Sequence, residues 1–305
     1  MVIKKLNTTT DHYGNITIAV FMAEAPVPTQ PAQSVTASVD TSKGFVCIGG
    51  GGTGSVGPPG ALLTASFPDD PQTMAGWTIR TKEHLQPDPN YRAKAYAIGM
   101  TVKDFTHDQL KDNIKYFSGD SLNMNWPVVT QSIGDDYSLL GGGFEVHYNT
   151  GNFGFATFPE SSFSWCARSK DMATPDPCTV TVYAIGIKTK LSKKDANGQD
   201  QPTGAEVITS FQSSNSSFLT NKAASHPEAT AKLTKDYILC GGGAEVHWTM
   251  GSTLGGNYLW SLEPPLDQTD DQPPPNQSFI ARSKDHFQTD LSTITTYAMG
   301  IKMRV

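Results

Sequence analysis

The chain has 305 residues, a net charge of −6 and only 17% charged residues. This balance argues against a protein that neutralises phosphates with clustered Lys and Arg, so we expect no nucleic-acid partner. No apolar run approaches the roughly 20 residues of a membrane-spanning helix, so the sequence predicts no transmembrane segment.

The first apolar run, Ile16 to Ala23, ends beside a tripeptide that faintly resembles a leader cleavage site. We interpret the run as a strand rather than a signal peptide, because Asp11 and His12 precede it and because it occupies a repeat position. The sequence leaves the cellular location of the protein unknown. The cytoplasm and export by a non-classical route are the two alternatives.

Short segments rich in β-branched and aromatic residues predict further strands along the chain. They are Ser34–Val39, Phe45–Ile48, Thr179–Ile185, Tyr237–Cys240 and Ser292–Tyr297. Helical periodicity is nearly absent. One or two helical turns are predicted for Asp108–Phe117, and for Asn221–Thr230 if Pro227 does not interrupt them.

Three glycine triplets mark an internal repeat. They are Gly49-Gly50-Gly51, Gly141-Gly142-Gly143 and Gly241-Gly242-Gly243, and each is followed downstream by Tyr-Ala-(Ile/Met)-Gly. This self-similarity predicts an all-β protein of three tandem repeats of about 90–115 residues. The repeats are 1–99, 100–186 and 187–305, each with about five strands, and the third carries a Pro/Asp/Gln-rich loop insert. Because no Gly/Ser linker separates them, we favour a compact pseudo-threefold arrangement over separate domains.

The motifs GGGAEVHW, ARSKDH and YAMGIK resemble those of tandem-repeat proteins from bacteria that have no characterised activity. The resemblance covers nearly all of the chain and implies no activity, cofactor or site. The first repeat departs most from the pattern, since it has Gly-Thr-Gly-Ser-Val where the others have Glu-Val-His.

Glycine inside a β run predicts a β-bulge or a close approach of two backbones. A tight loop that exposes amides to a ligand is the alternative for the triplets. The segment 52–57 also matches G-x-G-x-x-G, but Pro-Pro-Gly follows it instead of a helix. We therefore expect no dinucleotide, and no cofactor of another kind.

The four cysteines do not share a repeat position. Cys166 and Cys178 lie on two predicted neighbouring strands, and a hairpin centred near Met172 would place them opposite each other. A disulfide and two reduced thiols both fit this pair. Cys47 and Cys240 lie in apolar runs and are predicted to be small buried hydrophobes.

A Glu-Val-His sequence occurs in the second and third repeats. Residues i and i+2 of a strand share a face, so Glu145 with His147, and Glu245 with His247, are weak candidates for metal ligands. Asp171, or Asp285 with His286, would complete such a site. Tyr148 and Trp248 are expected to point the opposite way. The alternative is that these residues are polar side chains that face solvent. The first repeat has neither the glutamate nor the histidine.

An Arg-x-Lys-acid motif recurs in all three repeats, three residues after an aromatic side chain. Arg and acid groups can hydrogen-bond sugar hydroxyls, and an aromatic ring supplies a stacking face. Cross-strand salt bridges, with the tryptophans in the core, are the alternative. The candidate ligand-binding residues are Trp77, Arg80, Lys82, Glu83, Trp165, Arg168, Lys170, Asp171, Arg282, Lys284 and Asp285.

These patterns favour a non-enzymatic, multivalent, lectin-like protein that recognises glycan or another cell-surface polymer, because linked weak sites gain avidity. The nucleophile and zinc motifs of common hydrolases are missing from the sequence, so we expect no enzyme. The alternatives are a structural or assembly protein (a fibre, capsid or injection-apparatus component) and the receptor-binding component of a toxin. The sequence leaves oligomerisation open.

Overall fold

The computed structural model describes residues 3–55, 57, 60–83, 90–172, 174–216, 223–248, 256–264, 277–286 and 289–304. Within this part the chain forms three antiparallel sheets, one 3-10 turn and one short α-helix, so the predicted all-β class is confirmed. No helix in the described part is long and apolar enough to cross a membrane.

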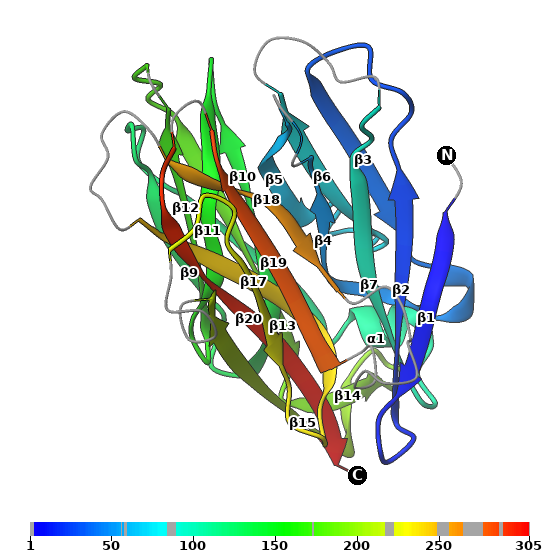
Figure 1. Ribbon diagram of the computed structural model, residues 1–305. Helices are drawn as coiled ribbons and strands as arrows, with labels where there is room; N and C mark the ends of the chain where they lie inside the picture. The colour runs from blue at the N-terminus through cyan, green and yellow to red at the C-terminus, as the bar shows by residue number, and fades with distance from the viewer. Residues whose placement is uncertain are drawn as a thin grey trace.

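Each sheet contains strands that are distant in sequence (Figure 1). Sheet I runs β1 (Lys4–Thr10), β2 (Ile16–Glu24), β7 (Lys94–Val102), β4 (Val46–Thr53), β18 (Asn257–Glu263), β19 (Ser278–Asp285), β16 (Glu228–Lys232). Sheet II runs β3 (Ala32–Ser38), β6 (Gly76–Lys82), β5 (Leu62–Pro68), β10 (Tyr137–His147), β13 (Thr179–Lys188), β8 (Ile114–Asp120). Sheet III runs β14 (Lys190–Lys194), β15 (Asp200–Asn215), β20 (Ser292–Arg304), β17 (Ile238–Trp248), β11 (Asn152–Ser161), β12 (Ser164–Asp171), β9 (Val128–Ser132).

Every sheet is shared between two of the sequence repeats. The strand that carries a glycine triplet pairs with a strand of another repeat: β4 with β18, β10 with β5, and β17 with β11. In Figure 1 the orange strand β18 accordingly lies beside the blue strand β4. The same joint recurs three times, so backbone hydrogen bonds within each sheet hold the repeats together.

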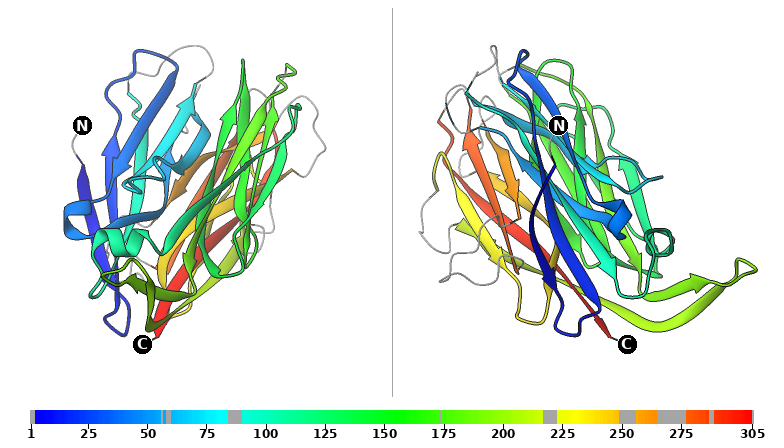
Figure 2. Two further views of the ribbon diagram at one scale, coloured as in Figure 1. Left: turned by 180° about the vertical axis from the view of Figure 1, so that it is seen from behind. Right: turned by 90° about the vertical axis from the view of Figure 1, so that its right-hand side faces the viewer.

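The prediction of about five strands per repeat is too low. The described strands number seven, six and seven in the three repeats. The prediction missed β9 and β16, which are five residues each. It also missed the polar hairpin of β14 and β15, which projects from the body in the right-hand view of Figure 2.

The predicted helix over Asp108–Phe117 is correct only at its start. The helix α1 spans His107–Lys111 and begins at a capping box formed by Thr106 and Gln109. Ile114 then begins strand β8, which pairs with β13. Of the other suggested helix, residues 221–222 lie outside the described residues and residues 228–232 form strand β16.

The glycine triplets lie within strands, as the bulge interpretation predicted, and the exposed-loop alternative is wrong. A register shift immediately precedes each triplet, at Ile48, Leu140 and Cys240. The first glycines lie close together, since a Cβ on Gly241 would come within 3.2 Å of the Gly141 Cα. Small residues therefore allow the central strands of the three sheets to meet.

The second glycine of each triplet leaves room for a large ring. A Cβ on Gly50, Gly142 or Gly242 would overlap the ring of Trp77, Trp165 or Phe279 respectively. These rings are at most 1% exposed, and they belong to one continuous core that involves all three sheets. Each ring comes from a sheet other than that of its glycine, so this packing joins the sheets.

The predicted hairpin between Cys166 and Cys178 is wrong. Strand β12 pairs with β11 and β9 in sheet III, whereas β13 pairs with β10 and β8 in sheet II. The chain changes sheets between the two cysteines, and all four cysteines are free and buried. Cys47 and Cys240 are 0% exposed, as predicted for small hydrophobes.

Candidate functional site

The three arginines of the repeated motif lie on the outer faces of the sheets. Each guanidinium lies over an aromatic ring of the adjacent strand: Arg80 over Phe67 at 5.3 Å, Arg168 over Phe158 at 5.2 Å, and Arg282 over Trp260 at 5.7 Å. The sequence had paired the first two with Trp77 and Trp165. Those tryptophans are 1% and 0% exposed, so their burial supports the core alternative.

Each arginine also forms an ion pair with a glutamate of another strand of its sheet, and the pairs of Arg80 and Arg168 reach across an intervening strand. Arg80 pairs with Glu145, and Arg168 Nη1 lies 2.5 Å from Glu245 Oε1. Both pairs link consecutive repeats. Arg282 instead pairs within its own repeat, 2.6 Å from Glu263 and 2.5 Å from Glu228. The cross-strand ties that the sequence offered as an alternative are therefore present.

The Glu-Val-His sequences place glutamate and histidine on the outer faces. His147 Nε2 lies 2.8 Å from Thr181 Oγ1, and His247 Nε2 lies 2.9 Å from Thr295 Oγ1. Glu245 and His247 are 4.0 Å apart at their nearest side-chain atoms. Among the described residues, no group of three or more His, Cys, Asp or Glu side chains is placed to hold a metal ion.

The lysines and acids of the motif differ in burial. Lys82 lies over the Tyr148 ring at 4.9 Å, whereas Lys170 is 0% exposed. Burial lowers the pKa of Lys170, and it lowers the pKa of Lys284, which is 3% exposed, to about 8. The buried acids are Glu83 and Asp171, while Asp285 is partly buried and lies 3.3 Å from His226.

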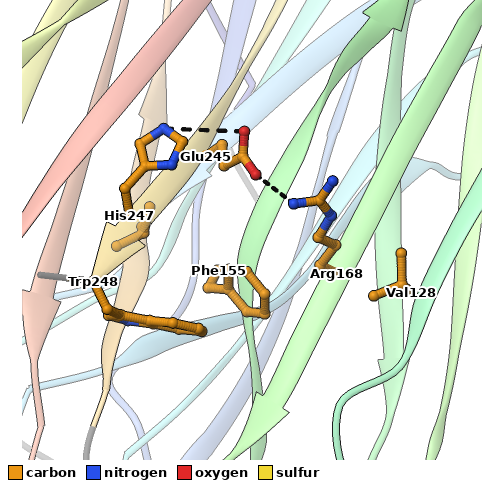
Figure 3. Close-up of a pocket in the computed structure, with 7 residues that line it drawn as sticks. Val128, Phe155, Arg168, Glu245, His247 and Trp248 are labelled. Carbon is orange, nitrogen blue, oxygen red and sulfur yellow. Dashed lines mark hydrogen bonds and ion pairs between the residues drawn. The ribbon is translucent and has the colours of Figure 1, made fainter. Parts of the chain in front are cut away.

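A groove of about 560 Å³ lies on the outer face of sheet III (Figure 3). It is lined by Val128, Phe155, Arg168, Glu245, Val246, His247 and Trp248. The rings of Phe155 and Trp248 are 4.5 Å apart, and Figure 3 shows the Arg168–Glu245 pair and His247 beside them. The groove therefore combines an aromatic surface with hydrogen-bonding groups.

Sequence reasoning missed most of this aromatic surface. Trp248 was expected to face away from Glu245 and His247, but it lines the same groove at the end of β17. Its indole Nε1 donates to the Asn257 carbonyl oxygen at 3.2 Å, which fixes the ring. Phe155 lies at a register shift of β11, where strict alternation does not assign a face.

No protein-family model matches this chain, and no curated protein sequence matches it. The geometry of the outer faces is therefore the basis for assigning a function.

Proposed function

We propose that this protein is a non-enzymatic, lectin-like binding protein that recognises glycan or another cell-surface polymer. The observation that carries the proposal is the groove on sheet III, where Phe155 and Trp248 lie beside the paired Arg168 and Glu245. Ligand sites typically combine an aromatic wall with a few polar groups that fix orientation.

The chemistry of the groove suits a sugar ring. The apolar face of a pyranose can lie on the half-buried Trp248 ring, because an aromatic ring offers a flat hydrophobic surface. Hydroxyl groups of the sugar can donate to Glu245 and accept from Arg168. The ion pair and the Trp248 hydrogen bond hold these groups before a ligand arrives, which reduces the entropy lost on binding.

The other two sheets supply further contact surfaces. Arg80 over Phe67 and Arg282 over Trp260 repeat the arrangement of Arg168 over Phe158, each with a glutamate partner. A surface with many copies of the ligand could engage more than one of these faces. Apparent affinity would then exceed that of a single site.

A glycan array tests the proposal with wild-type protein and two matched variants. Trp248→Ala removes one of the two aromatic rings of the groove, while Tyr148→Ala removes the residue that follows Glu-Val-His in the second repeat. We expect wild-type binding to at least one glycan class, a loss of roughly tenfold or more for Trp248→Ala (about 1.4 kcal/mol) and little change for Tyr148→Ala. Folded wild-type protein that binds no glycan would overturn the proposal.

An assembly role is the second candidate, favoured by a different observation. The β14–β15 hairpin projects from the body, and edge strands present backbone groups that can pair with another chain (Figure 2). Light scattering and electron microscopy of the purified protein would distinguish the two candidates. Regular filaments or shells, without glycan binding, would favour assembly.

A further inference from the structure

The three repeats serve as internal comparisons for the groove. Val128 lies opposite Arg168 in sheet III, while Ser34 lies opposite Arg80 and Glu228 lies opposite Arg282. Val128, Ser34 and Glu228 therefore occupy the same position in three copies. Two residues earlier stand Trp126, Ala32 and His226. Trp126 Nε1 donates to Asp171 at 3.1 Å, and His226 lies 3.3 Å from the corresponding Asp285.

The second repeat carries an exposed apolar row at these positions. At alternate positions of the sequence, Leu122, Met124, Trp126 and Val128 are 81%, 45%, 41% and 51% exposed. The chain crosses from sheet II to sheet III within this row, since Met124 pairs with Cys178, whereas the carbonyl oxygens of Asn125 and Pro127 accept from Asp171 and Ser169 of β12. The third repeat has Ala224, His226 and Glu228 in the last three positions, and the first has Gln30, Ala32 and Ser34. The residues at these positions in the other two repeats are small, polar or charged, so the exposed apolar side chains are particular to the second repeat.

The row continues directly from the groove. Val128 belongs to both, and the Trp126 ring meets the Trp248 ring edge to face at 5.7 Å. Beneath them lies the buried Lys170, whose Nζ is 5.0 Å from the Trp126 ring and 5.7 Å from the Trp248 ring. An apolar surface thus runs from Phe155 through Trp248 to Trp126, supported from inside by a cation.

The charges of this surface favour an uncharged ligand. The carboxylate of Glu245 neutralises Arg168 at 2.5 Å, and His247 is hydrogen-bonded to Thr295. The net charge of −6 would also repel an anionic polymer at low ionic strength. A sulfated or uronic-acid chain therefore gains little from these groups.

We propose that the groove and the exposed ring of Trp126 beside it form one extended site for a neutral, unbranched glycan chain of several sugar rings. This inference rests on the proposed function, because it assigns a ligand class to the same site. One ring occupies the groove at Trp248, and further rings of the chain pass over Trp126.

Calorimetric titration with oligosaccharide ladders tests the chain length and the charge. The probes are one to six units of β-1,4-linked glucose, α-1,4-linked glucose, β-1,4-linked xylose and β-1,4-linked N-acetylglucosamine, with oligogalacturonate as the anionic comparator. We expect one neutral ladder to gain roughly tenfold or more in affinity between two and four units. Trp126→His, which installs the residue of the third repeat, should remove that gain and leave disaccharide affinity within about twofold. Trp248→Tyr, which installs the residue of the second repeat, should weaken binding at every length.

The outcomes separate this inference from the proposed function. Equal affinity for short and long chains, an unchanged length gain in folded Trp126→His, or tighter binding of oligogalacturonate would overturn the extended neutral site alone. Phosphatidylcholine vesicles that bind wild type but not Trp126→His, with no sugar binding, would identify a lipid-contacting surface instead. Folded wild-type protein that binds none of these sugars and no glycan on the array would overturn both proposals.

Discussion

Replacing Gly142 with alanine would place a methyl group where the Trp165 ring and the Tyr183 carbonyl oxygen already lie. Trp165 is 0% exposed and its indole Nε1 donates to Thr157 Oγ1 at 2.8 Å, so the ring has no free space into which to move. Overpacking of a core costs ~1–3 kcal/mol, and we expect the upper end because both a ring and a backbone atom stand in the way.

The neighbouring glycine provides a matched control. A Cβ on Gly141 would meet its nearest atoms, Gly241 Cα and the Ile48 carbonyl oxygen, at 3.6 Å, which is ordinary contact. Neither glycine has a positive φ, so backbone strain does not distinguish the two sites. Gly141→Ala should therefore change stability little, or raise it by up to ~1 kcal/mol by restricting the unfolded chain.

Thermal melts followed by calorimetry or circular dichroism measure the difference. With an unfolding entropy of roughly 2.1 cal/mol/K per residue, the 305 residues give about 0.64 kcal/mol/K. A cost of ~3 kcal/mol then lowers Tm by about 5 °C for Gly142→Ala, while Gly141→Ala should stay within about 2 °C of wild type. Equal melting temperatures for the two variants would refute the packing account of the glycine triplets.

Four further predictions concern charges and thiols. A double-mutant cycle with Arg168→Ala and Glu245→Gln, measured by chemical unfolding, should give a coupling free energy below about 1 kcal/mol. A larger coupling free energy would show that the pair is mainly structural. If the triple variant of Arg80, Arg168 and Arg282 to alanine folds and still binds glycan like wild type, the arginines act only as cross-strand ties. Burial lowers the pKa of Lys284 to about 8 from 10.5, so the unfolded chain binds more protons between these pH values and stability should rise across them. Lys284→Met should lose that rise in paired melts, and an identical pH profile would contradict the burial argument. Burial raises the pKa of Cys178 to about 11 and that of Cys47 to about 12, so native protein should react with a disulfide reagent far more slowly than urea-unfolded protein, and rapid native labelling would contradict their burial.

Local patterns of the sequence were sufficient for the fold class and the glycine bulges. β-branched residues predicted strands, and glycine inside such runs predicted the close approach now seen at Gly141 and Gly241. The pairing of β4 with β18 could not be predicted in this way, because which repeat supplies the partner strand depends on three-dimensional packing. The short strands β9 and β16 lack a strong apolar signal, since one of their faces is exposed.

The candidate site was predicted only in part. Arg168 was identified, but its stacking partner was taken as Trp165, three residues earlier, although an odd spacing on a strand places two side chains on opposite faces. The ring under Arg168 comes instead from the adjacent strand, at Phe158. Phe155 and Trp126 were missed because a β-bulge and an edge segment outside the strands carry them.

A crystal structure with the best-binding oligosaccharide of the array tests the central claim most directly. The account predicts a sugar ring against Trp248, within hydrogen-bonding distance of Arg168 or Glu245, and further rings toward Trp126. An oligosaccharide bound only on sheet I or sheet II, with the groove on sheet III empty at saturating ligand, would contradict it.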